Sequence, residues 1–215
     1  MTRKAMLGCG FAHDVAEDTG WAMVMASPYQ QGALSQLASY LSNYTDYHSE
    51  APMRPDSSRI VLEGNQLYLD AQPHEMLLFN GMICDWLTAS EGVNSDAPAV
   101  TLRLSYMPFV FLGHLLWAEC QYQKQIEIGH NGHYFSPKEM LEALADSHND
   151  RCGELGEYSF KIKSRAETPI SPKAESIEID ETGWHILSEF AARSYVPESD
   201  ASRLAGAGAG LTDND

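Results

Sequence analysis

The sequence predicts one α+β domain over residues 1–196 and a tail rich in glycine and alanine over residues 197–215. Helical and strand periodicities occur in an irregular order, whereas a doubly wound sheet needs regular alternation. The composition, 44% hydrophobic and 20% charged, is ordinary for a packed protein. We therefore expect an antiparallel α+β layer structure with an N-terminal helical hairpin, antiparallel β-hairpins, a buried central helix and a C-terminal helix.

The first quarter of the chain is predicted to be helical. Apolar residues at helical spacing indicate a helix over 12–26, which Pro28 ends, and a second helix over 34–41. These two helices are expected to form the hairpin. The polar residues 42–58 include two prolines and are predicted to be a surface loop.

A β-hairpin and a broken apolar segment follow. Apolar runs lie on both sides of Gly64-Asn65, a pair that favours a tight reversal. In residues 76–87 the pair Asn80-Gly81 interrupts a strongly apolar run. We therefore expect two short buried elements there, not one helix.

The most buried helix is predicted near the middle of the chain. Residues 100–106 alternate as in a strand, and Pro108 is suited to the first position of a helix over 109–123. That helix is apolar on several faces. Residues 124–136 form a second predicted hairpin, in which Asn131-Gly132 suits a type I′ turn.

The last third begins with a marked helix start. Ser136, Pro137 and Glu139 have the spacing of a capping box with proline in the first turn. Residues 158–164 alternate as a strand, and residues 165–176 contain two prolines and are predicted to be a linker. A final helix over 180–195 should dock through one face; its docking residues are expected to be Trp184, Leu187, Ala191 and Tyr195, or their neighbours.

Charge and cysteine content narrow the class of protein. Thirty acidic and fourteen basic residues give a formal net charge of −16, which disfavours nucleic acid and anionic membranes as partners. No apolar run is long enough to cross a bilayer, and the first residues do not form a signal peptide, so we expect a cytoplasmic protein. The four scattered cysteines, Cys9, Cys84, Cys120 and Cys152, are predicted to be free thiols.

Familiar cofactor and nucleophile motifs are incomplete. Gly8 and Gly10 begin a phosphate-binding loop, but His13 stands in place of the third glycine. His74-Glu75 begins like a zinc-protease helix, but Leu78 replaces the second histidine. No G-x-S-x-G elbow is present. The sequence predicts no cofactor.

Several polar residues are candidates for a site. His130 and His133 flank a hairpin turn and could share a metal ion with a third ligand, although histidines also commonly occupy exposed turns. His114 is interpreted as a buried, hydrogen-bonded histidine, with a tuned general base near Glu119 as the alternative. The carboxylates around Glu17 and Asp18 are interpreted as solubilising groups and partners of helix N-termini.

The C-terminal tail is the most unusual segment. Its composition alone predicts a solvated terminus, because ordering a glycine-rich backbone is entropically costly. The alternative is a segment docked in a groove of its own body or of a neighbour. The residues that would make this site are Arg203, Gly206, Gly208, Gly210, Asp213 and Asp215.

Three segments carry a resemblance to a known family. The tail SYVPESDASRLAGAGAGLTDND, the opening GCGFAHDVAEDTGWAM and the central MPFVFLGHLLWA resemble the bacterial proteins called domain of unknown function 3726. Members of that family carry about ten more helical residues ahead of the position where this chain starts, which suggests an upstream start. The resemblance implies a cytoplasmic protein, carries over no catalytic residue and favours docking of the tail, with Arg203 on a carboxylate or an anionic ligand.

Two functional hypotheses follow. The first is a non-catalytic binding or accessory protein with a docking tail, which self-associates or serves a metabolic enzyme. The second is a small-molecule enzyme, with or without a metal ion, whose site is assembled from scattered residues: His114, Glu119, His130 and Arg203.

Overall fold

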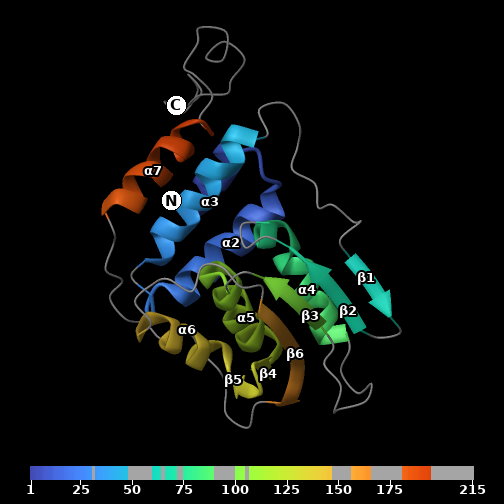
Figure 1. The fold of residues 1–215 in the computed structure, drawn as a ribbon. Helices are drawn as coiled ribbons and strands as arrows, with labels where there is room; N and C mark the ends of the chain where they lie inside the picture. The colour runs from blue at the N-terminus through green and yellow to red at the C-terminus, as the bar shows by residue number, and fades with distance from the viewer. Residues whose placement is uncertain are drawn as a thin grey trace, which may run out of the picture.

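The α+β class is confirmed by the computed structural model, shown in Figure 1. It describes residues 1–30, 32–47, 60–63, 66–71, 75–89, 100–104, 107–146, 156–165 and 181–194. The helices in this part are α1 (Thr2–Gly8), α2 (His13–Ala26), α3 (Ala33–Tyr47), α4 (Met76–Ala89), α5 (Phe109–Tyr122), α6 (Pro137–Asp146) and α7 (Glu181–Ala192). The strands are β1 (Ile60–Glu63), β2 (Gln66–Asp70), β3 (Val100–Leu104), β4 (Lys124–His130), β5 (His133–Phe135) and β6 (Gly156–Arg165).

The strands form one sheet in the order β1-β2-β3-β6-β4-β5. Both predicted hairpins, β1–β2 and β4–β5, are confirmed as antiparallel pairs. The expectation of a wholly antiparallel layer is wrong, because β2 and β3 are parallel, with Leu67 opposite Val100. Parallel neighbours need a crossover connection, and α4 lies in the one that joins β2 to β3.

Helix α4 corrects a second prediction. Residues 76–89 form one continuous helix through Asn80-Gly81, which we expected to separate two elements. Gly81 is not among the described glycines with a positive φ, so it follows the helix without a turn. Burial of Leu77, Ile83 and Leu87 on the rest of the molecule outweighs the weak helix propensity of the central pair.

Helix α5 lies at the centre of the molecule and packs on α2, α4, α6 and β4. The prediction that it is heavily buried is confirmed, since its residues from Val110 to Leu116 are all buried. Pro108 is the N-cap of this helix, whereas we expected it at the first helical position. The helix itself begins at Phe109. At Gly113, a Cβ atom would lie 2.0 Å from the carbonyl oxygen of Ala22, so α5 and α2 touch backbone to backbone.

Helices α1, α3 and α7 form a layer beyond α2. In Figure 1, α3 and α7 run side by side at the end of the molecule remote from the sheet. Helices α2 and α3 follow one another as expected, but α2 packs mainly on α5 and α3 mainly on α7. Helix α3 continues to Tyr47, so the start of the predicted loop at residue 42 is wrong. Helix α1 was not predicted.

Helix α7 docks on α1 and α3 with a face that differs partly from the expected one. Leu187 and Ala191 are buried as predicted, together with Gly183 and Phe190. Trp184 itself is 39% exposed, and its neighbour Gly183 is buried in its place. Tyr195, the linker after residue 165 and the tail lie outside the described residues.

Two local predictions are confirmed in atomic detail. The backbone N–H of Ser136 donates to Glu139 Oε2 at 2.7 Å, and the N–H of Glu139 donates to Ser136 Oγ at 3.2 Å, which completes the capping box. In the β4–β5 turn, Asn131 and Gly132 have φ values of 51° and 76°, as a type I′ turn requires.

Cys9, Cys84 and Cys120 are free thiols as predicted, while Cys152 lies outside the described residues. Among the described helices, none has the length and apolarity that a membrane span requires.

Candidate functional site

A cleft lies between α2 and α4, with α5 at its base. Its volume is about 560 Å³. Its polar lining consists of Asp14, Asp18 and Thr19 from α2, Asn80 and Asp85 from α4, and His114 from α5. The cleft therefore joins residues that are up to a hundred positions apart in the sequence.

Helical spacing and one close contact assemble this lining. Asp14 and Asp18 are one turn apart and so share a face of α2, while Gly81 and Asp85 do the same on α4. The backbone contact at Gly113 holds α5 against α2. His114, the next residue, is thereby placed at the base of the cleft.

Asn80 is the most informative residue of the cleft. Its side chain is 2% exposed, and in the structure neither its Oδ1 nor its Nδ2 has a hydrogen-bond partner. A buried amide without partners costs about 1–3 kcal/mol, so such groups usually have a reason to be kept. An amide both donates and accepts hydrogen bonds, so Asn80 in the lining of the cleft is suited to binding a polar group.

His114 is a second buried group without a full set of partners. It is 1% exposed and its Nδ1 has no hydrogen-bond partner in the structure, contrary to the hydrogen-bonded histidine we expected. Its ring meets Trp117 edge-on, with centroids 5.4 Å apart. Burial lowers the pKa of His114 from 6.5 to about 4, so the imidazole is neutral near pH 7.

Three carboxylates line the same cleft. Burial raises the pKa of Asp18, and the nearby charges of Asp14, Glu17 and Asp85 raise it further. A Cβ atom on Gly81 would lie 3.6 Å from Asp18 Oδ2, so this carboxylate reaches α4. The interpretation of Asp18 as a merely solubilising group is therefore incomplete.

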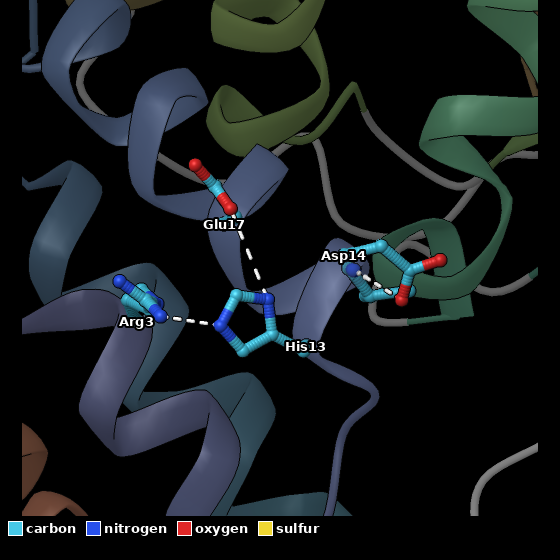
Figure 2. A network of polar contacts seen from close by, with 5 residues as sticks. Arg3, His13, Asp14 and Glu17 are labelled. Atoms are coloured by element: carbon cyan, nitrogen blue, oxygen red, sulfur yellow. Dashed lines mark hydrogen bonds and ion pairs between the residues drawn. The ribbon is translucent and has the colours of Figure 1, made fainter.

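The start of α2 has two sides, which Figure 2 shows. On the side facing α1, Arg3 donates to His13 Nε2, and His13 Nδ1 lies 3.8 Å from Glu17 Oε2. On the other side Asp14 points toward α4, and its Oδ1 accepts the backbone N–H of Val15 at 2.9 Å. Glu17 thus lies outside the cleft and Asp14 lies inside it.

The predicted metal ligands His130 and His133 face each other at the end of the β4–β5 hairpin. His130 stacks on Tyr158 with 4.2 Å between ring centroids, and its Nδ1 donates to the carbonyl of Glu157 at 3.1 Å. Its Nε2 accepts from the amide of Asn131 at 3.0 Å. No three His, Cys, Asp or Glu side chains in the described ranges are grouped to hold a metal ion, and metal binding here stays a prediction.

The other predicted site residues that the structure describes do not line the cleft. Glu119 is buried beside β4, where its Oε1 accepts the backbone N–H of Ile126 at 2.7 Å. The tail residues Arg203, Gly206, Gly208, Gly210, Asp213 and Asp215 lie outside the described residues. Among the described members of the scattered enzyme site, His114, Glu119 and His130, only His114 lines the cleft.

Cys9 and Cys84 do not offer a reactive thiolate. Burial raises the pKa of Cys9 to about 11, against a smaller lowering by Arg193. Burial also raises the pKa of Cys84, which is fully enclosed. Both thiols are therefore protonated near pH 7.

Sequence reasoning missed Asn80 and the carboxylates as members of one site. A signal was present: if residues 76–87 are a helix, Asn80 lies one turn from Met76 and one turn from Cys84, on an apolar face. Its reading as a turn residue concealed that signal.

Comparison with known proteins adds no assignment: no family model matches the chain, and no curated protein or solved structure matches it significantly. The resemblance to the domain of unknown function 3726 family stays a prediction.

Proposed function

We propose that this chain is a non-catalytic binding protein that holds a small polar molecule in the cleft between α2, α4 and α5. The observation that carries the proposal is a pair of buried side chains at the cleft: Asn80, whose Oδ1 and Nδ2 lack hydrogen-bond partners, and His114, whose Nδ1 lacks one. A ligand that hydrogen-bonds to these atoms would offset the free-energy cost of burying them without partners. A volume of about 560 Å³ is in the range of small-molecule sites.

Retention of a ligand tests the proposal. The protein is purified from cell extract and its native mass is compared with the mass of the denatured chain. We expect a small molecule on the wild-type protein and none on Asn80→Leu, which replaces the amide with an apolar side chain. The ligand-free Asn80→Leu protein should also be more stable by about 1–3 kcal/mol, because an unsatisfied buried amide has been removed.

A control on the same helix is Thr88→Val. Thr88 Oγ1 donates only to the carbonyl of Asp85, and Thr88 does not line the cleft. This variant should retain the ligand. A wild-type protein that carries nothing, even after incubation with cell extract, together with an Asn80→Leu variant that is less stable, would contradict the proposal.

The second candidate is an enzyme that uses the same cleft. It is favoured by the neighbouring Asp18 and His114, because burial raises the pKa of the first and lowers that of the second. The retained compound separates the two functions. A binding protein returns it unchanged after prolonged incubation, and an enzyme alters its mass.

A further inference from the structure

We infer that the ligand of the cleft is an aliphatic organic cation, with an ammonium group at one end and an uncharged hydrogen-bonding group, such as a primary amide, at the other. This inference rests on the proposed function and names its ligand class.

The charge of the cleft selects a cation. Asp14, Asp18 and Asp85 line it, and its described lining includes no lysine or arginine. Among the described side chains, no hydrogen bond or ion pair offsets the negative charge of the Asp18 carboxylate. The charges of Asp14, Glu17 and Asp85 act on it together, so bringing a positive charge among them relieves their mutual repulsion.

The walls of the cleft suit an aliphatic body. Leu77, Leu78 and Met82 of α4 line it, and so does the indole of Trp86. Aliphatic side chains favour a hydrocarbon segment, while an indole attracts an ammonium group to its face. A ligand with a short hydrocarbon chain and a charged end satisfies both.

The base of the cleft suits an uncharged polar end. Asn80 offers both a donor and an acceptor, which are complementary to the acceptor and the donor of another amide. His114 is uncharged near pH 7 because burial lowers its pKa to about 4, so it neither attracts a carboxylate nor repels a cation there. The polar end that fits is therefore neutral.

Four matched compounds test this assignment by isothermal titration calorimetry. The probe is 5-aminopentanamide, which carries an ammonium group and an amide. Pentanamide lacks the ammonium group, pentylamine lacks the amide, and 4-carbamoylbutanoate replaces the ammonium group with a carboxylate. We expect the probe to bind, the two truncated compounds to bind about tenfold or more weakly, and the anion to show no binding.

Variants locate the charge within the cleft. Asp18→Asn and the exposed Asp85→Asn should each weaken binding of the probe by about tenfold, and should do so less at high salt. Glu142→Gln is the matched control, because it removes one negative charge from the exposed face of α6, outside the lining of the cleft. It should weaken binding by less than about threefold. Melting curves verify that each variant is folded.

Three outcomes overturn the inference: no binding of 5-aminopentanamide, equal or tighter binding of 4-carbamoylbutanoate, or tight binding of magnesium or calcium ions that depends on Asp18. Failure of the proposed function is a separate result, because it is read from ligand retention whatever the charge of the ligand. A retained anion would reject the cation and keep the binding protein.

Discussion

Two buried titratable residues of α5 act on stability in opposite directions. Burial raises the pKa of Glu119 from 4.5 to about 7, although the hydrogen bond from Ile126 N–H works against this. Glu119 therefore binds a proton more tightly in the folded state than in the unfolded state. The resulting stabilisation of the fold is present at low pH and is lost as the pH rises toward 7. His114 has a lowered pKa, so its contribution is present above pH 6.5 and is lost as the pH falls toward 4.

Glu119→Gln should separate these effects. In the wild-type protein they nearly cancel between pH 5 and pH 7, since each changes the free energy of unfolding by about 2 kcal/mol. Glutamine keeps an acceptor for Ile126 N–H but does not titrate. We expect the variant to lose about 2 kcal/mol between pH 7 and pH 5, measured by urea unfolding.

Glu142→Gln controls for the general effect of removing a carboxylate. Glu142 is exposed and lies 3.6 Å from Lys138 Nζ in a surface ion pair. This variant should follow the pH dependence of the wild-type protein. If Glu119→Gln does the same, Glu119 is ionised in the folded protein at pH 5.

At the scale of elements, the contact between α2 and α5 decides where the cleft lies. Gly113 allows the two backbones to touch, and α4 packs on the same helix α5. The three helices are thereby held around one space. Gly81 also lies in a helix at the cleft, but a Cβ there would meet nothing closer than 3.6 Å.

Alanine at the two glycines should therefore have opposite effects. Gly113→Ala drives a methyl group into the carbonyl of Ala22 and should lower the free energy of unfolding by about 3 kcal/mol. Gly81→Ala improves helix propensity without a clash and should raise it by up to about 1 kcal/mol. Chemical denaturation measures both. Equal stability of Gly113→Ala and the wild-type protein would mean that α2 and α5 are farther apart than the structure shows.

At the scale of the whole molecule, a mixed sheet supports α4, α5 and α6, and α2 joins these to the layer of α1, α3 and α7. The acidic cleft lies within the helical part, between α2 and α4. Docking of the C-terminal tail, self-association and a metabolic-enzyme partner are sequence predictions on this same scale, and no described contact bears on them.

Deletion of residues 203–215 tests the tail prediction. If the tail docks, its removal should lower Tm by roughly 3 °C or change the oligomeric state, because contacts made only in the folded protein are lost. Differential scanning calorimetry and light scattering provide the measurements. Arg203→Gln in the full-length chain tests the anchor alone. An unchanged Tm, oligomeric state and partner recovery would show that the tail does not dock.

The site was predictable only in part. The sequence predicts His114 as a buried polar residue. It does not predict Asn80 as a site residue, because Asn80-Gly81 is interpreted as a break between two elements and not as part of a helix. Asp14, Asp18 and Asp85 carry no motif, because neither their spacing nor their type distinguishes them from surface carboxylates. They line one cleft only because α2 and α4 lie on opposite sides of it.

By itself the sequence determined the local elements: the capping box at Ser136, the turn at Asn131-Gly132, both hairpins and the buried helix after Pro108. These depend on residues a few positions apart, whose interactions are the same wherever the segment lies. The tertiary structure alone decided that α4 is continuous, that β2 and β3 are parallel, and that Asp18, Asn80 and His114 share one cleft. Each of these results from packing between segments distant in the chain, which local propensity does not specify.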